Sequence, residues 1–165
     1  MSTSYIRLDQ PLTTSLHSMS KFTALTVAFA AALFGNSAAL SCPDAARFGG
    51  VSISPSTLSP GQTYTVSADL TCAVQLGYTP TYLDYYIVGS ASHTISGPIL
   101  VARRTYDSST NPPADTFTAV LPDWYYFTDA TYSFQMVDSF AQDGPSGDPV
   151  ITSGSISIPM NITGF

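Results

Sequence analysis

The chain has 165 residues and a formal net charge of −6, with five lysines and arginines against eleven acidic residues. This acidic balance argues against binding to nucleic acids and against docking onto a membrane through basic side chains, because both partners carry phosphates. Every acidic residue is aspartate, the single lysine is Lys21, and threonine, serine, tyrosine, valine and isoleucine are abundant. Such a composition favours strands over helices and predicts an all-β fold.

The segment before residue 42 has the features of a secretory signal peptide. Lys21 precedes fourteen uncharged residues, 22–35, which match a signal-peptide core in length and are too few to cross a bilayer as a helix. A buried core helix is the alternative, but the strand-like sequence that follows offers it no helical partner. We therefore expect residues 1–41 to be a signal peptide and the rest of the chain to be secreted.

Two details of this leader stay open. Small residues allow cleavage before Leu40 or before Cys42, and translation starts at Met1 or at Met19. Either way, residues 42–165 have the length of one domain and keep three arginines and ten aspartates, a net charge of −7.

Cys42 and Cys72 are the only cysteines, and both follow the apolar leader. An even count in an exported chain favours a disulfide, which closes a loop of about 30 residues and adds roughly 3 kcal/mol of stability. Two separate buried thiols are the alternative. Two thiols and His93, the only histidine after the leader, are too few ligands for a zinc site.

Short alternating runs separated by turn residues recur about every 10 to 18 positions, which is typical of an immunoglobulin-like or fibronectin-like antiparallel β-sandwich. A turn at residues 54–61 joins the first two runs. We expect about seven strands, at residues 51–53, 63–72, 81–88, 98–106, 115–121, 130–140 and 150–162.

Individual residues place some of these strands. The run at residues 81–88 is apolar on both faces apart from Asp84, so we expect this strand at the centre of a sheet. Arg103 and Arg104 follow each other in the next strand and therefore take opposite faces. Pro159 cannot donate a ladder hydrogen bond, so we expect the last strand at an edge or with a bulge.

The segment at residues 130–134 resembles the tyrosine corner of immunoglobulin-type domains. Tyr132 opens the penultimate strand, and its hydroxyl is expected to bond back across the preceding loop. Phe134 stands where the core cysteine of those domains would be. The bridge of Cys42 would therefore tie the N-terminal lead to the end of the second strand instead.

Catalytic chemistry has little support in the sequence. His93 lies in a polar loop, no nucleophile motif accompanies it, and the loop aspartates are typical of turns and of solubilising charge. Asp138, Asp143 and Asp148 are the right residue type for Ca²⁺ but lack the alternating oxygen ligands of a calcium loop. We expect no enzyme, no cofactor and no metal site.

Aromatic residues are more informative. Trp124, Tyr125, Tyr126 and Phe127 follow one another in an expected connection between strands. Exposed rings on an acidic module stack on sugars or anchor a protein partner, whereas buried rings would plug one end of the sandwich. Trp124, Tyr125 and Tyr126 are the candidate binding residues, and we expect Trp124 to be the most exposed of them.

The end of the chain carries a sequon for N-glycosylation, in which Asn161 is the acceptor and Thr163 the hydroxyl residue. A glycan at Asn161 would fit an exported protein. No apolar tail follows the sequon, so we expect no glycosylphosphatidylinositol anchor.

Together with the leader, three segments resemble the necrosis-inducing secreted (NIS1-like) effector family of fungi. They are the opening ISPSTLSPGQTY at residues 53–64, the strand ATYSF at 130–134 and the closing ISIPMNIT at 156–163. The resemblance implies a β-rich secreted protein that binds receptor-associated kinases of a plant host and dampens immune signalling. The resemblance assigns no functional residue of that family to a position in this chain.

A second resemblance is to the Kre9/Knh1-like sandwich modules of fungal cell-wall proteins, and it implies a structural or polysaccharide-binding role in the wall. Those modules usually precede a long stalk rich in serine and threonine, which does not follow here, so free secretion is favoured. We therefore expect an extracellular effector-like protein, in the apoplast or cell wall, that binds a host or extracellular partner. A polysaccharide-binding wall module is the alternative, and the oligomeric state stays open.

Overall fold

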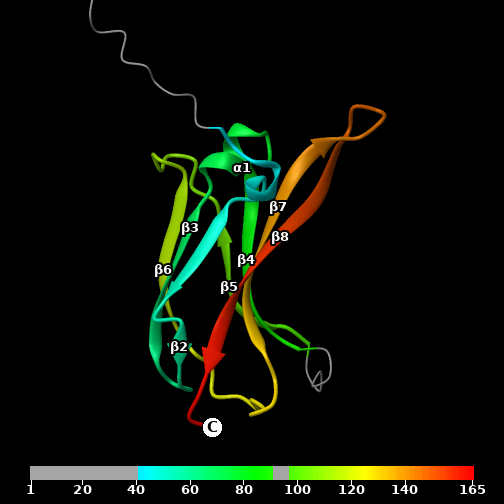
Figure 1. Cartoon of the computed structure of the whole chain (residues 1–165). Coiled ribbons are helices and arrows are strands. Elements are labelled where there is room, and N and C mark those ends of the chain that lie inside the picture. The colour runs from blue at the N-terminus through cyan, green and yellow to red at the C-terminus, as the bar shows by residue number, and fades with distance from the viewer. Residues whose placement is uncertain (1–40, 91–96) are drawn as a thin grey trace, which may run out of the picture. The chain divides into compact units, whose positions relative to one another are not determined.

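The computed structural model describes residues 41–90 and 97–165, which form two packed β-sheets (Figure 1). Residues 1–40 of the expected leader and the loop with His93 lie outside this description. The strands are β1 Gly50–Ser54, β2 Thr57–Leu58, β3 Thr63–Asp69, β4 Pro80–Gly89, β5 Ile99–Thr105, β6 Ala114–Val120, β7 Tyr132–Asp143 and β8 Pro149–Ile162. A short helix precedes β1 and another follows β3, namely η1 Asp44–Ala46 and α1 Thr71–Gln75.

The predicted all-β sandwich is confirmed, and its strand order is that of an immunoglobulin-like domain. One sheet has three strands in the order β1-β3-β6, which correspond to strands A, B and E of an immunoglobulin domain. The other has five strands in the order β2-β8-β7-β4-β5. In this sheet β8, β7, β4 and β5 correspond to strands G, F, C and C′. β4 lies between β7 and β5, as its apolar sequence predicted. All pairs are antiparallel except β2 with β8. Within the described residues, no helix is long and apolar enough to cross a membrane.

The strand expected at residues 63–72 is shorter than predicted. Its alternation holds through Asp69, with Tyr64 and Val66 facing the core. The Asp69 carboxylate then accepts a hydrogen bond of 2.9 Å from the amide of Thr71, which turns the chain out of β3 and into α1.

The turn expected at residues 54–61 contains an additional strand, β2. The amide of Asn161 donates to the carbonyl of Ser56 at 2.9 Å, and the amide of Thr163 donates to that of Leu58 at 2.8 Å. These bonds attach the turn to the end of β8, so the sandwich has eight strands instead of the expected seven.

Phe134 lies in the core, in contact with both sheets. Its buried ring stacks on Tyr85 of β4 with centroids 6.0 Å apart and meets Tyr64 of β3 edge-on, also at 6.0 Å. Two residues earlier, the Tyr132 hydroxyl accepts a hydrogen bond of 2.7 Å from the amide of Phe127. The predicted tyrosine corner is therefore present, with packed rings where immunoglobulin-type domains have an inter-sheet disulfide.

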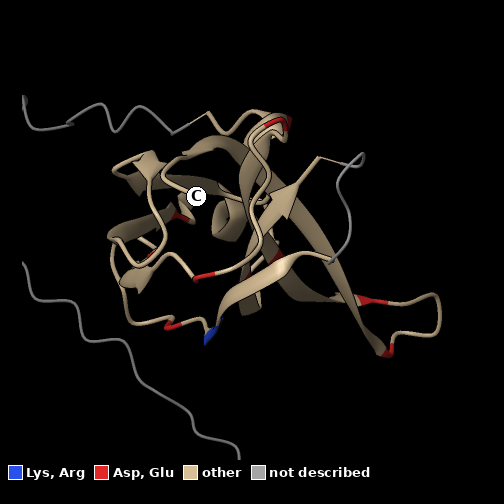
Figure 2. Cartoon of the chain, turned by 90° about the horizontal axis from the view of Figure 1, so that it is seen from below, with Lys and Arg blue, Asp and Glu red and all other residues tan. Residues whose placement is uncertain are grey.

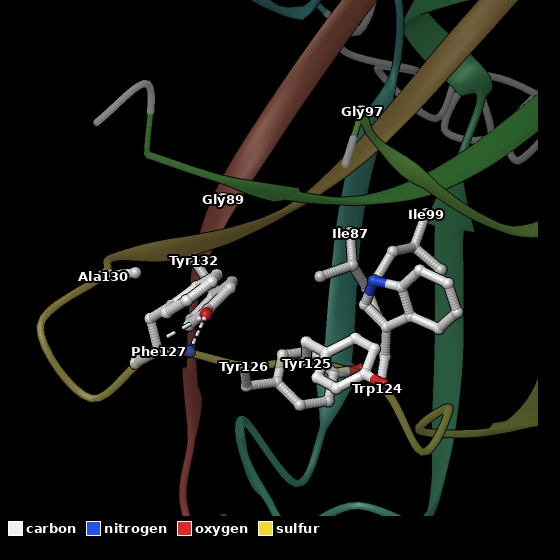
Figure 3. A pocket seen from close by; sticks show the side chains of 10 residues that line it. All are labelled: Ile87, Gly89, Gly97, Ile99, Trp124, Tyr125, Tyr126, Phe127, Ala130 and Tyr132. Atoms are coloured by element: carbon white, nitrogen blue, oxygen red, sulfur yellow. Dashed lines mark hydrogen bonds between the residues drawn. The ribbon is translucent and has the colours of Figure 1, made fainter. Parts of the chain in front are cut away.

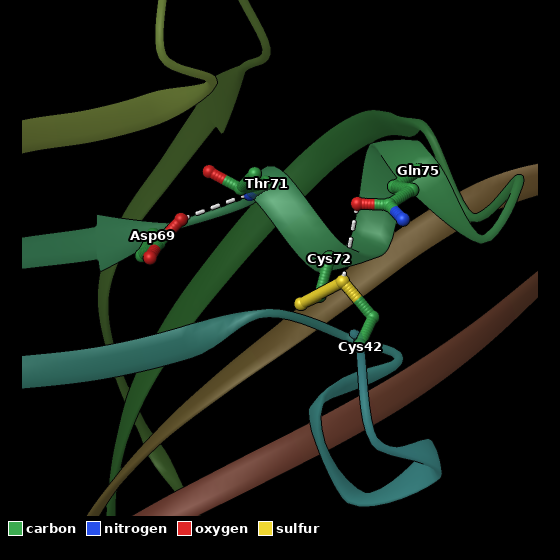
Figure 4. The surroundings of a disulfide bond; sticks show 5 residues. All are labelled: Cys42, Asp69, Thr71, Cys72 and Gln75. Carbon is green, nitrogen blue, oxygen red and sulfur yellow. Dashed lines mark hydrogen bonds between the residues drawn. A yellow bond between two sulfur atoms is a disulfide. The ribbon is translucent and has the colours of Figure 1, made fainter. Parts of the chain in front are cut away.

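Cys42 and Cys72 form the predicted disulfide, with their Cα atoms 5.4 Å apart (Figure 4). Cys72 lies on α1, so the bridge ties the segment before β1 to this helix and not to the end of a strand. The bridged residues are 30 positions apart, and closing such a loop stabilises the fold by roughly 3 kcal/mol.

The two arginines of β5 take opposite faces, as predicted. Arg103 pairs with Asp84 through two contacts of 2.7 Å. Arg104 donates to Asp115 of β6 at 2.7 Å, and Asp115 also accepts a hydrogen bond of 2.9 Å from the Tyr85 hydroxyl. Because β5 and β6 belong to different sheets, this second cluster links the two sheets along one side of the sandwich.

A carboxyl group without a partner lies in the core. Asp138 is fully buried on β7, on the same face as Met136 and Phe140, and it stands opposite Leu83 of β4 and Gly154 of β8. Neither of its oxygens has a hydrogen-bond partner among the described residues. Burial disfavours the ionised form and raises the pKa of Asp138 to about 7.

We predict that Asp138 makes the protein less stable as the pH rises from about 4 to about 7. In this range the folded state holds the carboxyl proton, whereas the unfolded chain, with an ordinary pKa of 3.8, has released it. The free energy of unfolding should fall by about 4 kcal/mol, and Asp138→Leu should abolish this fall. Urea titrations across the range measure the effect, with the exposed Asp143→Asn as control. A fall that persists in the leucine variant would contradict the assignment.

Candidate binding surface

The connection between β6 and β7, residues 121–131, carries the aromatic residues predicted to bind a partner. At its start, the amide of Leu121 donates to the carbonyl of Gln62 at 2.9 Å. Near its end, the amide of Phe127 donates to the Tyr132 hydroxyl. The aromatic segment is therefore anchored to the sandwich on both sides.

The structure separates the three candidate residues. Tyr125 is 81% exposed and Trp124 is 48% exposed, whereas Tyr126 is only 8% exposed. The rings of Trp124 and Tyr125 meet edge to face with centroids 5.8 Å apart, and we call this exposed pair the aromatic shelf. Tyr125, and not Trp124 as expected, is the most exposed of the three, and Tyr126 is buried too deeply to belong to a contact surface.

Tyr126 instead plugs one end of the sandwich. Its ring packs against Tyr132, with centroids 5.5 Å apart, and against Phe165 at 5.7 Å. Its hydroxyl donates a hydrogen bond of 2.9 Å to the carbonyl of Pro122, and burial raises the pKa of this hydroxyl to about 12. The loop thus serves both purposes considered from the sequence, because one ring closes the core while two rings face outward.

A small hollow lies beside the aromatic shelf (Figure 3). Ile87, Ile99 and Tyr132 contribute to its lining together with the shelf, and its volume is about 30 Å³, room for roughly one water molecule. Pockets for small molecules usually measure about 300 to 1,000 Å³. The shelf therefore suits contact with a surface, such as a protein or the face of a sugar ring, and does not enclose a ligand.

A wider open trough of about 420 Å³ crosses the outer face of the three-stranded sheet. Ser52, Ser67 and Thr116 form a row across β1, β3 and β6, with Asp69 and Thr71 at one end. No aromatic ring is among the described residues that line it. The trough offers hydrogen bonds and, through Val51, Pro112 and Pro113, apolar surface, but it has no ring that could stack on a partner.

Acidic residues are distributed over the described surface (Figure 2). Each described arginine pairs with an aspartate, in the pairs Arg47–Asp44, Arg103–Asp84 and Arg104–Asp115. Most of the positive charge in this part of the chain is thereby neutralised locally. The remaining surface is acidic and would attract a partner with basic groups.

The aspartates considered for Ca²⁺ do not come together. Asp138 is buried in the core, while Asp143 and Asp148 lie exposed at the tip of the hairpin formed by β7 and β8. In the part of the chain that the structure describes, no three histidine, cysteine, aspartate or glutamate side chains are placed to hold a metal ion.

Asn161, the acceptor of the sequon, is exposed on β8 next to β2. Its accessibility is compatible with glycosylation, which stays a prediction.

Comparison with known proteins found no match to a family model, to a curated protein or to a solved structure. The two family resemblances therefore also stay predictions.

We predict that the neighbouring aromatic residues differ in what they contribute to stability. Tyr126→Ala should lower the free energy of unfolding by about 3 kcal/mol, because it empties a buried site. Trp124→Ala should lower it by less than about 1 kcal/mol, because nearly half of this side chain is already exposed. Denaturant titrations of both variants measure the difference. Equal losses would show that Trp124 is a packing residue and not part of an exposed contact surface.

Proposed function

We propose that this chain is an exported binding protein that recognises an extracellular protein through the aromatic shelf. The observation that carries the proposal is the exposure of Trp124 and Tyr125 on a loop anchored at both ends. Tryptophan and tyrosine are enriched among the residues that dominate protein interfaces. Rings that are held in place before binding also lose less conformational entropy when the partner arrives.

The charge around the shelf indicates the chemistry of the partner. Asp123, directly before Trp124, is exposed, and the arginines of the described surface are paired with aspartates. A complementary partner would offer an apolar patch for the two rings and basic groups around it. Under the effector interpretation this partner is a host protein such as a receptor-associated kinase, and binding dampens host immune signalling.

Two features support export. The disulfide between Cys42 and Cys72 is typical of proteins that fold in an oxidising compartment. The sequon acceptor Asn161 is exposed, as glycosylation in the secretory pathway requires. Both fit the signal peptide predicted from the sequence.

A second candidate function is binding to a cell-wall polysaccharide. The observation that favours it is the shape of the shelf, because the partly exposed Trp124 ring beside a shallow hollow suits stacking on a sugar face. The same surface residues would then bind an insoluble glucan or chitin in place of a protein.

Side-by-side binding measurements test the proposal. The full chain, expressed in a secretory host, is incubated with plant apoplastic and plasma-membrane proteins, with insoluble β-glucan and with chitin. We predict capture of a defined protein, which is then purified, and Trp124→Ala should weaken its binding by about 2 kcal/mol, roughly thirtyfold. Tyr82→Ala, at an equally exposed tyrosine of β4, is the matched control and should have no effect.

The outcomes separate the two candidate functions. Retention on glucan or chitin that depends on Trp124 would replace the protein partner with a polysaccharide. Binding to any of the three materials that survives both Trp124→Ala and Tyr125→Ala would refute the aromatic shelf as the contact surface.

A further inference from the structure

β8 is the longest described strand, and along most of its outer edge no other described strand is hydrogen-bonded to it. It runs over Pro149–Ile162, and only Asn161 and Ile162 pair with β2 on that side. We call residues 150–160 the β8 edge (Figure 1). Part of it belongs to a two-stranded arm, since β4 pairs with β7 only as far as Phe140.

Between Pro149 and Pro159, the β8 edge lacks the usual protection against further pairing. Edge strands of soluble proteins are commonly short or carry charged residues or prolines. β1 and β2 are short, β5 carries Arg103 and Arg104, and β6 carries Asp115. Residues 150–160 contain no charged side chain, and Val150 and Ile151 are 48% and 61% exposed.

The backbone of the odd-numbered residues faces this open edge. The amides of Asn161 and Thr163 donate to the carbonyls of Ser56 and Leu58, and β2 therefore lies on the outer side of β8. Along a regular strand, the amide and carbonyl groups of every second residue point to the same side. Pro159 shares this phase, which explains why a residue without an amide hydrogen fits here with no shift in the pairing to β7. The residues whose amides face outward are Ile151, Ser153, Ser155 and Ser157.

Two prolines bracket these amides symmetrically. Pro149 and Pro159 lie at equal distances in sequence from Gly154. We propose that the β8 edge pairs antiparallel with the β8 edge of a second copy, with the two-fold axis at Gly154, so that one sheet runs through a homodimer.

In this register each outward amide donates a hydrogen bond to a carbonyl of the second copy, and each pair of opposite residues exchanges two such bonds. Ser153 stands opposite Ser155 of the second copy, and Ile151 stands opposite Ser157 of the second copy. A shift of two residues in either direction would bring a proline into the ladder, opposite a carbonyl that it cannot satisfy. On the other face of the strand, the exposed Val150 would contact Ile158 of the second copy and lose apolar surface to water.

Charge and symmetry both favour a second copy of the chain as the partner of the β8 edge. Asp143 and Asp148 lie at the hairpin tip beyond Pro149, and antiparallel pairing places the two acidic tips at opposite ends of the dimer. Parallel pairing would bring these carboxylates together. If β8 paired with a different edge strand of the second copy, the β8 edge of that copy would stay open, and further copies would add to form a filament. Pairing of β8 with β8 uses both edges and closes after two copies.

Sedimentation of the full chain, expressed in a secretory host, tests the proposal over a wide range of concentrations. We expect a monomer–dimer equilibrium that shifts toward dimer as salt screens the acidic surfaces. Ser153→Lys with Ser155→Lys should raise the dissociation constant at least tenfold, because lysines would face each other across the interface. Thr63→Lys with Thr65→Lys is the matched control. It adds the same charge at exposed positions of β3, a strand paired on both sides, and should leave the dimer intact.

Amide hydrogen exchange locates the interface independently. The amides of Ser153 and Ser155 should exchange more slowly as the protein concentration rises, while Trp124→Ala should leave both the dimer and this protection unchanged. A monomer at every concentration would overturn the proposal. So would a dimer that the lysine pair in β8 does not weaken, or concentration-dependent protection confined to other strands.

Discussion

The contact of Phe134 with Tyr64 and Tyr85 holds the two sheets together. Tyr64 comes from the three-stranded sheet and Tyr85 from the five-stranded sheet, so the Phe134 ring is packed against both at the position where immunoglobulin-type domains have a disulfide. Packed rings hold this position only if β7 enters the core in a fixed register. Tyr132, two residues earlier in the same strand, is thereby fixed as well.

Through Tyr132 the core determines the geometry of the candidate binding surface. Its hydroxyl accepts a hydrogen bond from the amide of Phe127, and its ring packs against Tyr126, so two contacts of one β7 side chain attach the loop between β6 and β7 to the sandwich. Trp124 and Tyr125 then have no place in the core and face outward. Stability and proposed function therefore share one loop, but they depend on different residues within it.

The sequence predicts those parts of the structure that follow from local pattern. Alternation identified β3, the cysteine count identified the disulfide, and residues 130–134 identified the tyrosine corner. It did not predict that β3 stops at Asp69, where a side-chain hydrogen bond competes with the ladder, or that β2 forms, since β2 depends on β8 about a hundred residues away. Nor could it separate Tyr126 from Tyr125, because adjacent loop residues follow no periodicity that reveals which ring is buried.

Tyr132→Phe is the sharpest test of whether the tyrosine corner holds the aromatic loop in place. This change removes the hydroxyl that accepts the Phe127 amide and keeps the ring that packs on Tyr126. Amide hydrogen exchange should show that Phe127 loses most of its protection. The Phe134 amide should exchange at most about fivefold faster, the effect of losing one hydrogen bond worth about 1 kcal/mol. Unchanged protection of Phe127, or an equal acceleration at Phe127 and Phe134, would contradict the account.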